Sequence, residues 1–140
     1  MSILLVSCVK VDGIRSRFVS SVTAVDGAGE PCSLPIPLLI DTGADITCFP
    51  RSSLFSDVGC VGRSILTRGH TGNVERSATR IITLALPTLG GTIFVTPPCG
   101  ILVTGSPTGL LGMDILGNCD MLKVGDEMVI EYRGLACSHD

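Results

Sequence analysis

The sequence is poor in aromatic and charged residues, and each shortage excludes a class of partner. Aromatic residues make up 4% of the chain and tryptophan is absent, so a platform for stacking nucleic-acid bases is not expected. Charged residues make up 16%, and the net charge of -3 offers no excess of positive charge to a phosphate backbone. We therefore expect no nucleic-acid partner.

Long hydrophobic runs are also missing. No apolar stretch approaches the about 20 residues that a membrane-spanning helix needs. The apolar residues at positions 3–9 are too few, follow no basic residue and precede no small-residue cleavage site, which is not typical of a secretion signal. We expect no membrane partner and no secretion by a signal of the chain's own.

Several chemical motifs are absent. The seven cysteines include no C-x-x-C pair, and His70 and His139 lie far apart, so we expect no metal and no other cofactor. Scattered cysteines in odd number are typical of reduced, partly buried thiols inside a cell. The chain has no G-x-S-x-G and no G-x-x-x-x-G-K segment, which argues against a serine hydrolase and a nucleotide site.

The residues that are present predict short strands joined by tight turns. Apolar residues make up 45%, and 17 glycines and 8 prolines are scattered among Val, Ile, Leu and Thr. At 140 residues the size is that of one domain. The alternation predicts strands at residues 3–11, 17–25, 34–40, 46–49, 63–82 (a hairpin), 81–86, 92–96, 101–103, 121–124 and 128–132, with a strand that turns into a short helix at 110–116. Pro35 and Pro37 predict an edge or a bulge where the third strand begins.

An acid stands at the end of an apolar run in the segment PIPLLIDTGADITCFP, residues 35–50. An ionised carboxylate at the end of a buried strand is costly unless it is hydrogen-bonded. A threonine hydroxyl at position 42 and a close backbone approach at Gly43 are ways to hold Asp41. Asp, Thr and Gly are also ordinary turn residues, so the tripeptide alone does not decide between a turn and a site.

Two segments together resemble a known family. Residues 38–45, LLIDTGAD, resemble the active-site motif of the retroviral aspartic proteases, the retropepsins, and residues 110–116, LLGMDIL, resemble the segment that packs behind that motif and leads into a helix. Between them lies the predicted hairpin with Gly69 and Gly72 at its tip, where the family has its flap. The resemblance covers about residues 17–132.

The resemblance implies a closed β-barrel with a flap hairpin and one short C-terminal helix, formed by a single domain over residues 1–140. Residues 1–16 would be an N-terminal extension or an interface strand, and residues 134–140 a frayed tail. It also implies an aspartic endopeptidase that acts on a viral or retroelement polyprotein, inside the cell or within virus particles. The sequence holds a single Asp-Thr-Gly, so the two carboxylates of such an enzyme would come from a homodimer.

Site residues follow from the same resemblance. Asp41 would be catalytic, and Thr42, Gly43 and Ala44 would complete the active-site loop. The predicted substrate contacts are Asp45, Arg68, Gly69, His70 and Gly72, although for His70 a solvated turn residue is the favoured interpretation. Met113 stands where the family often has an arginine that pairs with an acid matching Asp45, so Asp45 must find another partner or face the cleft.

Some alternatives stay open at this point. The chain could be an idle copy of the fold that serves as a dimeric interaction module, or a cellular relative with a non-viral substrate. Residues 3–6 and 129–132 could interlace with a second copy or form an ordinary edge within the chain. The apolar residues Ile40, Ile65, Val103 and Leu110 could line substrate pockets or belong to the core.

Overall fold

The chain folds almost entirely into strands. The computed structural model describes residues 2–56, 58–68 and 72–134. The elements are β1 (Ser2–Ile3), β2 (Val6–Val11), β3 (Ile14–Val25), β4 (Ile36–Ile40), β5 (Cys48–Pro50), the 3-10 turn η1 (Arg51–Ser53), β6 (Cys60–Arg68), β7 (Val74–Ile81), β8 (Thr83–Thr88), β9 (Gly91–Val95), β10 (Leu102–Thr104), β11 (Gly109–Leu111), α1 (Met113–Leu116), β12 (Cys119–Val124) and β13 (Glu127–Tyr132). The predicted mostly-β class with one short helix near the end is thus confirmed.

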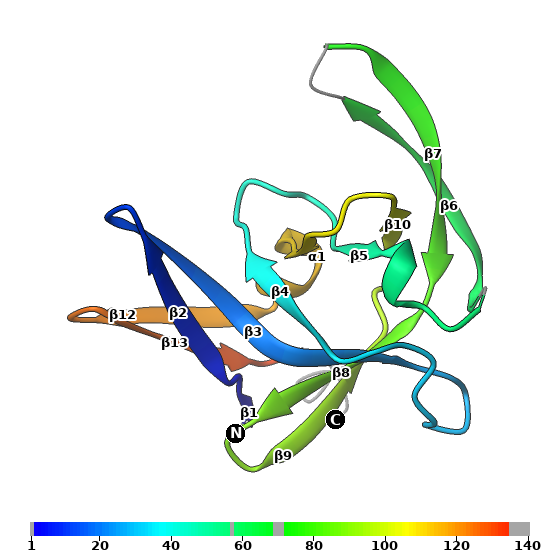
Figure 1. Ribbon diagram of the computed structural model, residues 1–140. Coiled ribbons are helices and arrows are strands. Elements are labelled where there is room, and N and C mark those ends of the chain that lie inside the picture. Colours follow the sequence, from blue (N-terminus) through cyan, green and yellow to red (C-terminus); the bar gives the residue numbers. More distant parts are fainter. Residues whose placement is uncertain (1, 57, 69–71, 135–140) are drawn as a thin grey trace.

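Three sheets make up the described part of the chain (Figure 1). The largest has eight strands, in the order β10-β5-β11-β4-β3-β8-β9 with β2 also paired to β3. A second sheet has the order β1-β13-β12, and β6 and β7 form a two-stranded sheet of their own, bridged at Arg80 to Ile101. The large sheet curls into a half-barrel, and the strand pairs of the described residues do not show the closed barrel that the resemblance implied.

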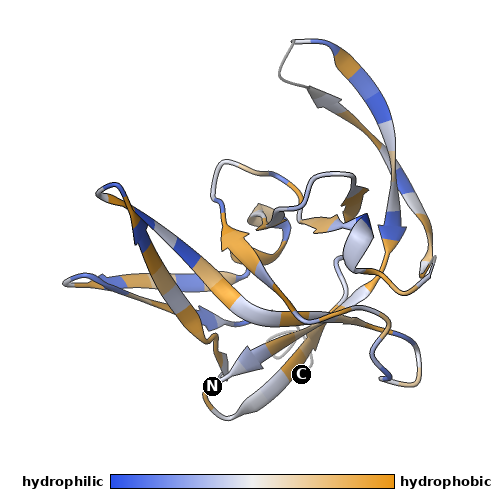
Figure 2. Ribbon diagram, in the orientation of Figure 1, coloured by the Kyte–Doolittle hydropathy of each residue, from blue (hydrophilic) through white to orange (hydrophobic). Residues whose placement is uncertain are grey.

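The core lies inside the curl of the large sheet. Its fully buried side chains include Val19, Val22, Leu38, Phe49, Leu84, Leu86, Ile101, Leu111, Ile115 and Ile130. Burying each of these side chains stabilises the fold by roughly 1.5–3 kcal/mol. Figure 2 shows the hydrophobic colouring of β4 and β10, whereas the tip of the β2–β3 hairpin is hydrophilic. Leu38 of β4 is buried in the core, and Val103 of β10 packs against it.

Strand β4 shows how the chain accommodates proline within a sheet. It lies between β3 and β11, so it is not the edge that its prolines allowed. Pairing shifts from Val19↔Leu38 to Val22↔Ile36, which leaves two residues of β3 opposite the single residue Pro37. This is the predicted bulge, and it suits a residue that has no N–H to give to the ladder.

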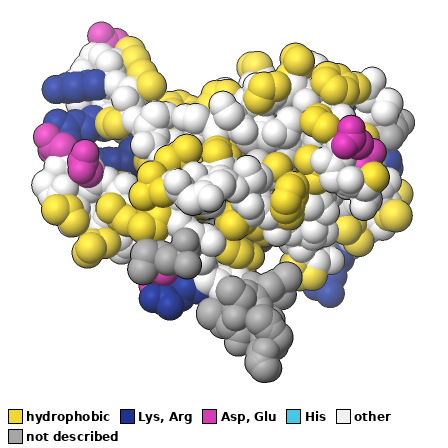
Figure 3. All heavy atoms as spheres, turned by 90° about the horizontal axis from the view of Figure 1, so that it is seen from below, with side chains coloured by type: hydrophobic (Ala, Val, Ile, Leu, Met, Phe, Trp, Pro, Cys, Tyr) yellow, Lys and Arg dark blue, Asp and Glu magenta, His cyan; other side chains and the backbone are white. Residues whose placement is uncertain are grey.

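The N-terminal residues belong to the fold. Strand β2 pairs with β3 through a turn in which Asp12 (φ 52) and Gly13 (φ 80) are both left-handed, as two-residue hairpins require. Strand β1 pairs with β13 of the same chain, Ser2 opposite Tyr132. Figure 3, a view from below, shows charged side chains gathered on the side where the tips of the β2–β3 and β12–β13 hairpins lie. There, Arg15 Nη1 contacts Asp126 Oδ1 at 2.5 Å.

The hairpin predicted at residues 63–82 is present as β6 and β7, which reach away from the large sheet (Figure 1). Gly69 and His70 lie outside the described residues, as do residues 135–140 of the expected frayed tail. Among the residues that are described, no helix is long and apolar enough to cross a membrane.

Candidate active site

The loop that carries Asp41 joins β4 to β5 and is fastened by a strand from far along the chain. Strand β11 lies between β4 and β5, parallel to β4 with Leu111 opposite Ile40, and antiparallel to β5 with Leu110 opposite Cys48. The backbone N–H of Asp41 donates to the carbonyl oxygen of Leu111 at 3.1 Å. Both ends of the loop are therefore held by the same three residues of β11.

The Asp41 carboxylate is half-buried and is held by the backbone of its own loop. Its Oδ1 accepts a hydrogen bond from the N–H of Gly43 at 2.9 Å, and the N–H of Ala44 donates to the Asp41 carbonyl oxygen at 3.2 Å. A side chain at position 43 would begin 3.2 Å from Oδ1, so glycine keeps this approach open. No described residue bonds Oδ2, which leaves one oxygen free for chemistry.

The hydroxyl that fastens the far end of this loop belongs to Thr47, which bonds Asp114 and Gly112 rather than Asp41. The Thr42 side chain is exposed and makes no hydrogen bond with the described residues. Thr47 is fully buried, and its hydroxyl donates to Asp114 Oδ1 at 2.7 Å and accepts from the N–H of Gly112 at 3.0 Å. Its own N–H donates to Asp114 Oδ2 at 3.0 Å.

Asp114 therefore ties the start of α1 to the end of the active-site loop. A third donor, the N–H of Ile115, bonds its Oδ1 at 2.9 Å. A carboxylate that accepts several N–H and O–H bonds is well compensated for its partial burial. Sequence reasoning placed Asp114 in a motif but missed Thr47. The available signal was a lone hydroxyl residue within the apolar run at residues 46–49.

The acid at position 45 faces solvent and the cleft. Asp45 is exposed and has no hydrogen bond or ion pair with the described residues. Met113 makes its link to the loop through its backbone, because its N–H donates to the carbonyl oxygen of Ala44 at 2.8 Å. Without the family's arginine at position 113, Asp45 could find another partner or face the cleft, and in the structure it faces the cleft.

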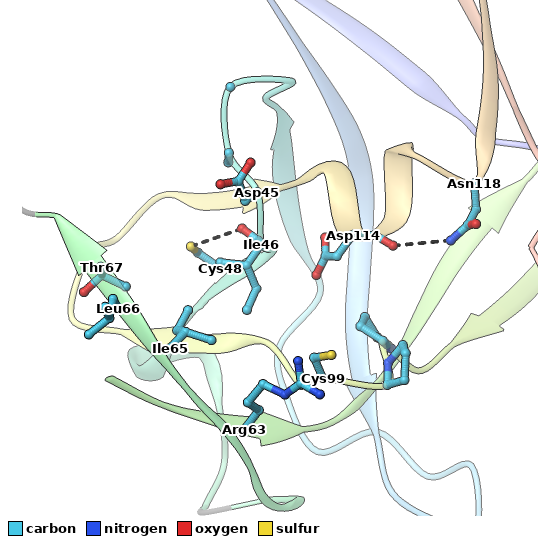
Figure 4. A pocket seen from close by; sticks show the side chains of 15 residues that line it. Asp45, Ile46, Cys48, Arg63, Ile65, Leu66, Thr67, Cys99, Asp114 and Asn118 are labelled. Carbon is cyan, nitrogen blue, oxygen red and sulfur yellow. Dashed lines mark hydrogen bonds between the residues drawn. The ribbon is translucent and has the colours of Figure 1, made fainter. Parts of the chain in front are cut away.

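A cavity of about 820 Å³ lies beside this loop. Three segments line it in addition to the loop, namely one strand of the hairpin, the turn before β10 and the helix region, and Figure 4 shows their side chains. The lining residues are Gly43, Ala44, Asp45, Ile46, Cys48, Arg63, Ile65, Leu66, Thr67, Pro97, Pro98, Cys99, Gly100, Asp114 and Asn118. The hairpin thus forms one wall of a cleft whose opposite wall is the active-site loop.

The remaining predicted residues lie in the hairpin, in the lining of the cavity or against the hydrophobic core. Gly72 is exposed with φ +83 and has open space around it, as a turn residue needs, and Arg68 pairs with Val74 through the backbone. Ile65 lines the cavity, whereas Ile40 and Val103 pack against the hydrophobic core. Of the four residues left open between pocket and core, these contacts decide for Ile40, Ile65 and Val103, whereas Leu110 belongs to neither group.

The thiol nearest this loop is unsuited to nucleophilic chemistry. Burial, followed by the charges of Asp114 and Asp41, raises the pKa of the Cys48 thiol. A thiol whose pKa is raised stays protonated near neutral pH and is a poor nucleophile. Among the described residues, no group of three His, Cys, Asp or Glu side chains is placed to hold a metal ion. The carboxylates that line the cavity itself are those of Asp45 and Asp114.

A comparison with known protein families gives a match that spans this loop. A family model described as aspartyl protease matches residues 23–115, a span that contains the Asp41 loop, the hairpin and the β11–α1 segment. No curated protein matches the chain. The matched span is more than half of the 140 residues, and the chain therefore belongs to the aspartyl protease family.

Proposed function

We propose that this protein is a retroviral-type aspartic endopeptidase that works as a homodimer, with Asp41 of each chain forming the catalytic pair. The observation that carries the proposal is the state of the Asp41 carboxylate. One oxygen is oriented by the Gly43 N–H at 2.9 Å, and the other has no partner among the described residues. A carboxylate held in this way at a half-buried position is ready to act on a water molecule.

The second carboxylate has to come from a second chain, because the sequence contains one Asp-Thr-Gly. A twofold axis close to Asp41 would bring two identical carboxylates together. Two such groups cannot both ionise easily, so they share one proton. The ionised member then removes a proton from water, and the protonated member donates to the carbonyl oxygen of the peptide bond.

The β6–β7 hairpin is proposed to be the flap over the cleft. In support, Ile65, Leu66 and Thr67 of β6 line the same cavity as Ala44 and Asp45 of the active-site loop. The base of the hairpin is held by the backbone bridge between Arg80 and Ile101, and no described strand pairs with its outer part, so we expect that outer part to bend. Such a hairpin would open to admit an extended peptide and close to exclude water. Arg68, Gly69, His70 and Gly72 at its tip are the proposed substrate contacts there.

The proposed substrate is a viral or retroelement polyprotein, processed inside the cell or within virus particles. This part of the proposal is supported by the resemblance of residues 38–45 and 110–116 to retropepsin motifs. The cavity adds support for a peptide substrate, because its walls combine apolar side chains with the exposed backbone of Gly43. A peptide needs both kinds of contact.

The first experiment compares wild type with Asp41→Asn on a peptide library at about pH 5, with cleavage read by mass spectrometry. Asparagine keeps an oxygen that can accept the Gly43 N–H, so the variant should fold like wild type and cut nothing. Asp12→Asn, in the β2–β3 turn, is the matched control and should cut normally. An active Asp41→Asn enzyme would refute the mechanism, and a folded dimeric wild type that cuts nothing would favour an idle interaction module.

A mixing experiment tests the shared site. Wild type refolded together with an equal amount of Asp41→Asn should keep about half of the activity that the same amount of wild type has alone, because mixed dimers hold one Asp41. Refolding with Asp12→Asn should cause no loss. Full activity in the Asp41→Asn mixture would show that one chain suffices and would overturn the homodimeric site.

A further inference from the structure

We infer that the cavity beside the active-site loop is a subsite for an acidic side chain of the peptide, most suitably glutamate, and that Arg63 recognises its carboxylate. The inference rests on the proposed function, since it names the substrate class of the same cleft. Among the described residues that line this cavity, Arg63 is the one Lys or Arg. It was not among the residues that the sequence singled out.

The backbone of Arg63 is fixed by a bulge in the hairpin. Pairing between β6 and β7 shifts from Val61↔Arg80 to Ser64↔Ala78, so Gly62 and Arg63 together oppose Thr79. A bulge re-aims side chains next to functional sites. Arg63 lies within this bulge, and its side chain lines the cavity.

Thr79 connects this bulge to the facing turn. It is fully buried, and its hydroxyl lies 2.7 Å from the carbonyl oxygens of both Arg63 and Cys99. A side chain at position 62 would meet Thr79 Oγ1 at 2.5 Å, and one at position 100 would meet it at 2.6 Å, so both glycines permit this close packing. Arg63 is thus presented from a rigid point between two walls of the cavity.

The guanidinium of Arg63 has no partner within the described ranges of the chain. The Arg63 side chain is exposed and makes no hydrogen bond or ion pair with the described residues. The carboxylate of Asp114 is bonded by Thr47 and by the N–H of Ile115 and forms no ion pair with Arg63. Figure 4 shows the Arg63 side chain extending beside Cys99, with Ile46 and Asp114 on the other side of the cavity.

The rest of the lining is suited to the stem of the incoming side chain. Ile46, Cys48, Ile65 and Pro97 supply apolar surface around the approach to Arg63. Glutamate has two methylene groups that such surface can cover, and its carboxylate matches the two-pronged donors of arginine. Glutamine has the same shape without the charge, so the preference for glutamate over glutamine isolates the contribution of Arg63.

The test is position-specific profiling of kcat/KM on peptides that carry Glu, Gln or Lys at each position around a cleaved bond. Wild type should prefer Glu to Gln about tenfold at one position, in line with a charge-assisted hydrogen bond in a partly open cavity. Arg63→Gln should abolish the preference and Arg63→Glu should turn it toward Lys. Arg76→Gln, which removes an arginine from the other strand of the same hairpin, should keep the wild-type preference.

A binding measurement separates this inference from the proposed catalysis. Fluorescence anisotropy with a labelled Glu peptide and the Asp41→Asn protein, with and without Arg63→Gln, requires no cleavage. The protein with Arg63 should bind the Glu peptide more tightly than the Gln peptide, and Arg63→Gln should reduce this difference. That result supports the subsite even if wild type cuts nothing. The inference would be overturned by cleavage without a Glu preference, or by a Glu preference that Arg63→Gln leaves unchanged. A Lys preference that Asp45→Asn removes, or the absence of both binding and cleavage, would overturn it as well.

Discussion

Replacing Thr47 with valine should destabilise the protein far more than replacing it with serine. Valine has the shape of threonine without the hydroxyl, so it removes the bond to Asp114 Oδ1 (2.7 Å) and the acceptor for the Gly112 N–H (3.0 Å). Serine keeps both bonds and loses one methyl group. Both variants change a fully buried side chain, so solvent cannot replace the lost bonds.

The expected magnitudes follow from the two bonds. A hydrogen bond to a charged group contributes about 1.5–3 kcal/mol, and a buried N–H left without a partner costs about 1–3 kcal/mol. Because the loop can relax, we expect a loss of about 3 kcal/mol for Thr47→Val. The missing methyl group of Thr47→Ser should cost about 1 kcal/mol.

Urea unfolding at one fixed protein concentration, in the Asp41→Asn background, measures both losses. The fixed concentration matters because a dimer's apparent stability depends on it. A Thr47→Val protein as stable as Thr47→Ser would refute the view that this hydroxyl holds the loop. A double-mutant cycle with Asp114→Ala should give a coupling energy of about 2 kcal/mol, and additive effects would equally contradict the network.

Two further predictions concern packing and pH. Gly112→Ala should lower stability and activity together, because a Cβ there would lie 2.6 Å from the Ile46 carbonyl carbon. Gly90→Ala is the control and should change unfolding little, because a Cβ there would have no neighbour within 4 Å. Equal urea-unfolding midpoints for the two variants would contradict this prediction. Burial, followed by the charge of Asp120, raises the pKa of the Cys119 thiol to about 11 from an ordinary 9.0. Since the unfolded chain releases this proton first, the contribution of Cys119 is complete below its ordinary pKa and is lost as pH rises through the folded pKa. Stability should therefore fall as pH rises in this range, and Cys119→Ala should make the fall less steep in a pH series of unfolding midpoints. An equally steep fall in the variant would refute this prediction.

Local signals in the sequence were enough to predict most strands and turns. The Asp12-Gly13 and Gly125-Asp126 pairs mark hairpins because a left-handed turn residue is needed there, and glycine or aspartate tolerates it. The acid of Asp41 was recognisable because it follows a run of aliphatic residues. Each of these features depends on neighbours within a few positions, which a sequence shows directly.

The contacts that complete the site depend on residues far apart, which is why the sequence did not reveal them. Thr47 and Asp114 are 67 positions apart, and nothing in either segment shows that they meet. Arg63 enters the cleft through a two-against-one register that depends on Thr79, 16 positions away. For Asp45, likewise, the sequence left a choice between another partner and the cleft, and the lining of the cavity decides for the cleft.

The position of β11 links the stability of the fold to the chemistry of Asp41. Because β11 pairs with β4 on one side and β5 on the other, it fixes the two ends of the active-site loop relative to each other. Gly112 and Asp114 follow it at once and hold the loop's far end through Thr47. A shift of residues 109–114 therefore moves the Asp41 carboxylate directly. In a homodimer this shift would occur twice at the shared axis, so packing defects there should reduce activity before they unfold the chain.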